Sequence, residues 1–292
     1  MTIHVRKEAL LQWIADDEAG KEDASLPIYS TPVEVRSAFA SEFGLHPSFL
    51  TLLIELAAGD AGFWRKAIEK LPPEAATRLI VTRWIEWLWS DSEIGFRERI
   101  DNPELRACGD AVCRLHYRAA AGEAVSRAEW RSVRFALGNP DSEEELQAAV
   151  AAVAAAAAWD LDTVPGAASD MIYAWKTALF TEIDRDLGWN EEKEAAANER
   201  SAAAATAGQV MADADRSASN AEGEAEDPAS SPRYRELYQK GMNEYLAVNP
   251  SDLDRRHELR YAKFMEAAGL AREGFLRQIE RSGSQHRPEV VA

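Results

Sequence analysis

Apolar side chains recur every three or four residues along most of this 292-residue chain, which is the spacing of one face of an α-helix. In residues 73–91 the side chains that follow this spacing are Leu79, Ile80, Trp84, Trp87 and Leu88. No segment alternates β-branched and polar residues between turn dipeptides, as a strand would. The pattern predicts an all-α fold with a multi-helix, bundle-like main domain.

Residues with strong preferences for helix ends predict where these helices begin and stop. Ser126 with Glu129, and Ser142 with Glu145, form the capping-box pattern, in which the first side chain accepts a backbone N–H three residues later. Gly44 suits the left-handed conformation that ends many helices. We therefore expect residues 31–194 to be a series of helices joined by short connections.

Two aspartates, Asp160 and Asp162, stand one residue apart. The helix that opens at Ser142 should end just before them, and Pro165 is suited to open the next helix. The carboxylates then lie in the connection, where they can accept backbone N–H groups at a helix start. A metal or phosphate site is the alternative, but it needs further ligands that the sequence does not place. We interpret the segment as a corner between helices.

The chain changes character after residue 194. From about residue 217 to 231 it has no large apolar side chain and many acidic ones, which favours a flexible linker. Residues 232–281 then show two amphipathic runs separated by Asn249-Pro250, a pattern that predicts a helical hairpin. These changes divide the chain into an N-terminal segment (1–30), a helical main domain (31–194), an alanine-rich, acidic and partly disordered linker (195–231), a C-terminal helical hairpin (232–281) and a tail (282–292).

A two-helix hairpin of this size is too small to be stable alone. It should pack on the main domain, pair with a second copy in a homo-oligomer, or bind another protein. We also expect the main domain to remain folded when residues 232–292 are deleted.

Acidic residues dominate the charge. The chain has 50 Asp and Glu against 33 Lys and Arg, a formal net charge of −17. Phosphate backbones and anionic membranes require clustered cations, so we expect no direct binding to nucleic acid or to a membrane. An acidic surface instead favours a basic protein as partner, and a DNA mimic belongs to the same set. Neither a signal peptide nor a membrane span is evident, which favours the cytoplasm, and the composition suggests a bacterial one.

Few residues have the spacing that catalysis or metal binding requires. Cys108 and Cys113 are five residues apart, so on a helix their side chains diverge by about 140°. No second pair of zinc ligands accompanies them, and the alternative is a cysteine thiol nucleophile with His116 as its base. Phosphate-binding glycine motifs and the nucleophile elbow are absent from the sequence. We therefore predict no cofactor, no metal and no assignable catalytic residue.

Tryptophans are the best candidates for an interaction surface. Trp84, Trp87 and Trp89 crowd one expected helix. Trp84 and Trp87 share a face, whereas Trp89 points away and is the candidate for an exposed anchor, since tryptophan is enriched at binding hot spots. Arg83 and Arg97 could join Trp89 in holding an acidic group.

A second candidate surface lies on the last expected helix, where apolar residues follow a spacing close to a coiled-coil seam. The candidate contact residues on it are Tyr261, Phe264 and Phe275.

These features favour a non-enzymatic protein–protein interaction protein. Its narrower form is an acidic inhibitor or immunity-type protein that neutralises a basic partner. The alternatives are an adaptor or assembly component that acts through the C-terminal helical hairpin, and an all-α enzyme whose site is spread over several helices.

Overall fold

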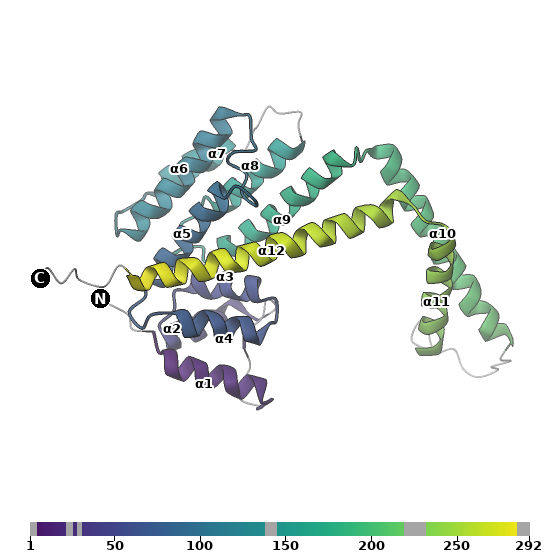
Figure 1. Cartoon of the computed structure of the whole chain (residues 1–292), viewed down its shortest axis with the longest axis horizontal. Helices are drawn as coiled ribbons and strands as arrows, with labels where there is room; N and C mark the ends of the chain where they lie inside the picture. The colour runs from purple at the N-terminus through teal and green to yellow at the C-terminus, as the bar shows by residue number, and fades with distance from the viewer. Residues whose placement is uncertain (1–4, 22–25, 28–30, 138–144, 219–231, 285–292) are drawn as a thin grey trace, which may run out of the picture. The chain divides into compact units, whose positions relative to one another are not determined.

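The fold is shown in Figure 1 by a computed structural model that describes residues 5–21, 26–27, 31–137, 145–218 and 232–284. The described residues form α-helices and no strand, which confirms the predicted all-α class. In chain order the helices are α1 (Lys7–Glu18), α2 (Val33–Phe43), α3 (Pro47–Ala57), α4 (Ala61–Lys70), α5 (Thr77–Ser90), α6 (Pro103–Ala120), α7 (Arg127–Leu137), α8 (Glu145–Ala157), α9 (Ala167–Asp186), α10 (Glu191–Ala218), α11 (Pro232–Val248) and α12 (Asp252–Ser284).

The helices belong to two compact units. Unit 1 comprises Met1–Thr181 and Lys263–Ala292, and unit 2 comprises Glu182–Ala262. The division falls within α9 and within α12, so it does not follow the boundaries expected from the sequence.

Local signals set several helix ends as predicted. The capping box opens α7, because Glu129 N donates to Ser126 Oγ at 3.2 Å and Ser126 N donates to Glu129 Oε2 at 2.8 Å. Gly44 ends α2 with a left-handed φ of 69°. The other predicted box includes Ser142, which is outside the described residues.

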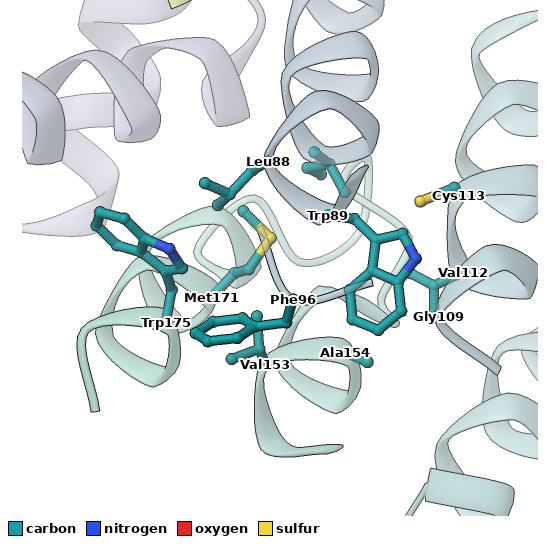
Figure 2. Close-up of a pocket in the computed structure, with 11 residues that line it drawn as sticks. Leu88, Trp89, Phe96, Gly109, Val112, Cys113, Val153, Ala154, Met171 and Trp175 are labelled. Atoms are coloured by element: carbon teal, nitrogen blue, oxygen red, sulfur yellow. The ribbon is translucent and has the colours of Figure 1, made fainter. Parts of the chain in front are cut away.

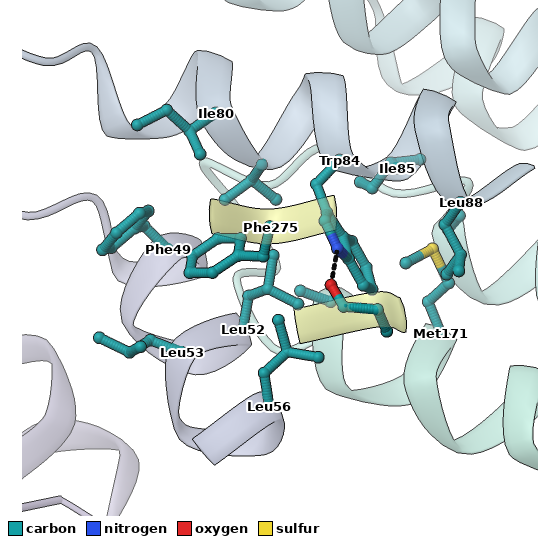
Figure 3. Packing of buried hydrophobic residues seen from close by; sticks show 14 of the residues in the cluster. Phe49, Leu52, Leu53, Leu56, Ile80, Trp84, Ile85, Leu88, Met171 and Phe275 are labelled. Atoms are coloured by element: carbon teal, nitrogen blue, oxygen red, sulfur yellow. Dashed lines mark hydrogen bonds between the residues drawn. The ribbon is translucent and has the colours of Figure 1, made fainter. Parts of the chain in front are cut away.

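The core of unit 1 contains side chains from the C-terminal part of α12. Phe275 is fully buried, and its ring centroid lies 5.2 Å from that of Phe49 on α3. Trp84 on α5 is also fully buried, and its indole Nε1 donates to the backbone oxygen of Ala271 at 3.1 Å (Figure 3). Residues 263–284 therefore belong to unit 1, whereas the sequence indicated a separate C-terminal hairpin.

Two tryptophans on α5 face glycines on its neighbours. A Cβ atom added to Gly109 on α6 would lie 2.0 Å from the Trp89 ring, and one added to Gly274 on α12 would lie 2.2 Å from the Trp87 ring. Only glycine lets the rings approach these helices so closely, because it has no Cβ. Helix α5 is thus packed between α6 and α12 within unit 1.

Unit 2 contains the hairpin that the sequence did not predict, between α10 and α11. Residues 195–218, expected as linker, continue α10, and residues 219–231 lie outside the described ones. The two helices cross at Gly208 and Gly241, where an added Cβ would lie 2.6 Å and 2.8 Å from backbone oxygens of the opposite helix. This close approach buries small side chains, such as Ala204 and Ala212, that would leave gaps between helices farther apart.

The corner at Asp160 and Asp162 is where the sequence predicted it, between α8 and α9. Its carboxylates bind mainly to another helix: Arg78 on α5 donates through Nε to Asp162 Oδ1 at 2.6 Å and through a terminal nitrogen to Asp160 Oδ1 at 3.3 Å. The expectation that these carboxylates would accept backbone N–H groups holds only for Asp160, which accepts from Asp162 N at 3.1 Å. The hydrogen bonds of Arg78 thus connect α5 with the segment between α8 and α9.

Candidate functional site

A polar cleft runs along the outward side of α5 in unit 1. It consists of two hollows of about 450 and 290 Å³, whose shared lining residues are Glu86, Ser90 and Tyr117. Helix α5 forms the floor, α6 contributes one wall, and α12 contributes Gln278 and Arg281 to the other. We call these two hollows the α5 cleft.

Arginine is unusually concentrated in the α5 cleft for so acidic a chain. Four arginines and two carboxylates line it: Arg83, Arg97, Arg114 and Arg281, with Glu86 and Asp110. Over the whole chain the balance is reversed, since 50 acidic residues stand against 33 basic ones. The charge of the cleft is therefore opposite in sign to that of the protein.

One carboxylate of the cleft is neutralised within the protein. Arg97 binds Asp110 through two hydrogen bonds, of 2.9 and 3.1 Å, and Trp89 Nε1 donates to the same carboxylate at 3.0 Å. Burial raises the pKa of Asp110, but these hydrogen bonds outweigh burial and hold that pKa below its usual value. Arg97 and Asp110 together add no net charge to the cleft.

The other carboxylate is held by a tyrosine. The Tyr117 hydroxyl donates to Glu86 Oε2 at 2.6 Å, and burial together with this bond raises the pKa of Tyr117. By formal charge the residues that line the cleft are four arginines against two carboxylates, so arginine predominates in its lining.

Gln278 is the most unusual residue of the cleft. It is only 2% exposed, yet it lines the larger hollow. Its amide carries two donors and an acceptor, so it is a polar group in the lining of the cleft.

The structure separates the tryptophans and arginines that the sequence grouped. Trp87 and Arg83 line the larger hollow and are half-buried. The expectation that Trp89 is an exposed anchor is wrong, because its ring is 7% exposed and packs on Gly109. Arg97 does lie beside Trp89, but both bind Asp110.

The remaining predicted contact residues have three different environments. Trp84 and Phe275 are fully buried in the core and cannot meet a partner, so their assignment to an interaction surface is wrong. Phe264 is half-buried against the core of unit 1. Tyr261, in unit 2, is 68% exposed and stays a candidate.

The cysteine and histidine candidates on α6 do not form a nucleophile and base. Burial raises the pKa of Cys113 to about 12, so its reactive thiolate form is suppressed near neutral pH. His116 is fully buried, its Nε2 binds the backbone oxygen of Ala157 at 2.7 Å, and its ring lies 4.9 Å from that of Trp130. These contacts make His116 a core residue.

Stability should fall in mild acid because of His116. Its Nδ1 is buried with no partner among the described residues, and burial lowers its pKa from 6.5 to about 4. The unfolded chain therefore binds a proton that the folded chain does not between these values, so the free energy of unfolding should decrease by up to about 3 kcal/mol as the pH falls from 6.5 to 4.

Urea unfolding of the wild type and of His116→Gln at several pH values in this range checks this expectation. The variant should show a shallower pH dependence, and the exposed-site control His257→Gln should match the wild type. An unchanged slope in His116→Gln would contradict the assignment.

A second polar cluster contains serine, histidine and aspartate in contact, as a catalytic triad does, but its serine is not accessible to a substrate. His46 Nδ1 lies 2.7 Å from Ser48 Oγ, and His46 Nε2 lies 2.8 Å from Asp162 Oδ1. Ser48 N also donates to Nδ1, so the imidazole caps the start of α3. Because Ser48 is fully buried, no substrate can reach its hydroxyl, and the cluster is structural.

A small apolar cavity of about 20 Å³ lies deeper in unit 1, between α5, α6, α8 and α9 (Figure 2). Its lining includes Trp89, Phe96, Met171 and Trp175. The space is about that of one water molecule and has almost no polar lining, so it is a packing gap rather than a ligand site.

Comparison with known proteins identifies no relative: no family model, no curated protein and no solved structure matches this chain. Within the described residues, no three or more His, Cys, Asp and Glu side chains are grouped to hold a metal ion. None of the described helices has both the length and the apolar character to cross a membrane.

Proposed function

We propose that this chain is a non-enzymatic protein–protein interaction protein whose partner docks in the α5 cleft. The observation that carries the proposal is the composition of the cleft, which combines a half-buried tryptophan, a tyrosine and several arginines. Tryptophan, tyrosine and arginine are the residue types enriched at binding hot spots. Gln278, which also lines the larger hollow, adds an amide that can donate and accept hydrogen bonds.

The narrower form of the proposal is an acidic inhibitor or immunity-type protein that neutralises a basic partner. It is supported by the net charge of −17. A field of this sign accelerates the approach of a basic protein over about a Debye length, while short-range contacts in the cleft fix its orientation.

Affinity capture with the full chain as bait tests docking in the cleft. Ser90→Trp should block it, because Ser90 is exposed and lines both hollows, and its hydroxyl donates within α5, to the backbone oxygen of Glu86. Ser132→Trp, at an exposed position on α7, is the matched control. We expect the wild type and the control to retain one protein that Ser90→Trp loses, identified by mass spectrometry.

The salt dependence of the complex tests the narrower form. A basic partner should be held more weakly at about 300 mM than at about 50 mM NaCl, because salt screens the attraction between opposite charges.

If Ser90→Trp retains the same protein as the wild type in the capture experiment, the docking site is elsewhere. Retention of no specific protein by the wild type would defeat the interaction proposal itself.

A further inference from the structure

We infer that a pocket in unit 1, between α2 and the start of α5, binds the ammonium group of a lysine side chain on a docked basic protein. This pocket, which we call the α2 pocket, has a volume of about 490 Å³, within the usual range for ligand sites. It shares no lining residue with the α5 cleft. The inference therefore goes beyond the proposed function, because it concerns a second surface that can be tested independently of the cleft.

Apolar groups form much of the lining of the α2 pocket. Leu45 and Pro47 come from the turn after α2, and Ala75 and Ala76 come from the segment before α5. The aliphatic stem of a lysine side chain can lie on such a surface while its charged end reaches polar groups or water. The lining thus suits a long side chain with an apolar stem.

Glu74 supplies a negative charge that the protein itself does not use. The other charged residue of the lining, Arg78, is bound to Asp160 and Asp162. Glu74 is exposed and forms no ion pair or hydrogen bond with any of the described residues. Its carboxylate is therefore available to a cation that enters the pocket.

Two serine hydroxyls of α2 add further acceptors. Ser37 and Ser41 are one helical turn apart, and both line the pocket. Helical serines often donate to the backbone oxygen four residues earlier, as Ser90 does to Glu86 at 2.8 Å. Within the described part of the chain, the hydroxyls of Ser37 and Ser41 form no such bond. An ammonium group has three N–H donors, which match one carboxylate and two hydroxyl oxygens.

The charges at the start of α5 also favour a cation. A helix start by itself attracts anions, because its first N–H groups have no partner within the helix. Here Arg78, in the first turn of α5, is already bound to two carboxylates, Asp160 and Asp162. His46 adds no charge near neutral pH, because burial lowers its pKa. Together with Glu74, three carboxylates stand against one guanidinium group.

An NMR titration of the full chain tests the inference. The probe is the pentapeptide acetyl-Ala-Ala-Lys-Ala-Ala-amide. It is compared with the same peptide carrying norleucine, which keeps the aliphatic stem without the charge, and with the same peptide carrying glutamate. The signal followed is the backbone amide of Gly44, which lines the pocket. We expect a saturable shift with the lysine peptide and none with the other two.

Matched variants connect binding to particular residues. Glu74→Gln should weaken binding of the lysine peptide about threefold to fivefold, the size of an exposed ion pair. Glu34→Gln removes the same charge at an exposed position of α2 outside the lining, and it should leave binding unchanged. Ser41→Trp should abolish the saturable shift by filling the pocket. Because Ser41 is exposed, the urea midpoint of this variant should remain that of the wild type.

Four results would overturn the inference. The first is no saturable shift with the lysine peptide. The second is equal binding of the norleucine peptide, which would show that the pocket reads only the apolar stem. The third is tighter binding of the glutamate peptide, as the helix start alone would favour. The fourth is equal weakening by Glu34→Gln and Glu74→Gln, which would assign the effect to the overall charge.

These failures differ from failure of the proposed function. If Ser90→Trp abolishes capture of a protein while the lysine peptide does not bind, the interaction proposal stands and only the assignment of the α2 pocket falls.

Discussion

Deletion of residues 263–292 is expected to unfold unit 1, and not to release a separable module. The deleted part of α12 contributes Phe275 and Ile279, both fully buried, and Leu276, which is 7% exposed. Full burial of one such side chain stabilises the folded state by about 1.5–3 kcal/mol. The sum for these three alone is comparable with the lower end of the total stability of a domain, about 5 kcal/mol.

The deletion also removes polar contacts. Trp84 would lose the acceptor of its indole N–H, the backbone oxygen of Ala271, while its neighbours on α3 and α5 became exposed to water. The truncated chain should lack the near-ultraviolet circular dichroism of ordered tryptophans and should lose its cooperative urea transition. Truncation after Ser284 is the control, because it keeps all of α12 with Phe275, Leu276 and Ile279, and it should retain the cooperative transition. A cooperative transition at the wild-type midpoint in the longer deletion would refute the prediction.

The same residues show why the sequence pattern did not reveal that the C-terminal part of α12 packs in the core of unit 1. The spacing of Phe264 and Phe275 correctly indicated a buried face on a long helix, whereas Tyr261, in the same pattern, is 68% exposed. Periodicity reports that a face is buried, however, and not what it is buried against. The partner of Phe275 is Phe49, more than 200 residues earlier in the chain, and no local pattern records that pairing.

The pairing of α10 with α11 was missed for a different physical reason. Large apolar side chains are the usual sign of a buried helix face, and residues 195–218 have few of them. Small side chains also bury surface when two helices approach closely, and Gly208 against Gly241 permits this approach. Alanine has the highest helix propensity of all residues, so the helix was predictable from composition, but its contact with α11 was not.

The candidate site was predictable only in part. Arg83 and Trp87 were identified because arginine and tryptophan on one helix suggest a hot spot. Gln278 and Arg281, nearly 200 residues later, were not, since only the fold brings α12 beside α5. Trp89 was expected to be exposed because it points away from Trp84. That side of α5 is covered by α6, so both sides of the helix are buried.

Gly109→Ala should destabilise unit 1 by about 3 kcal/mol, because Gly109 on α6 contacts the Trp89 ring. This value is in the upper part of the range for overpacked cores. The new Cβ would lie 2.0 Å from the Trp89 ring, a distance that real Cβ atoms essentially never show (Figure 2). The ring cannot easily turn aside, because it is 7% exposed and its Nε1 is bonded to Asp110, which Arg97 holds in turn.

Gly269→Ala on α12 is the matched control, because the same substitution there meets nothing within 4 Å of its Cβ. Alanine lowers the conformational entropy of the unfolded chain, so the control should stabilise the protein by about 0.4–1 kcal/mol. Urea unfolding of both variants measures the two changes, and their opposite signs distinguish a steric effect from a general effect of alanine. Equal stability of Gly109→Ala and the wild type would mean that α5 and α6 can separate without cost, and the α6 wall of the α5 cleft would then not be rigid enough to orient a partner.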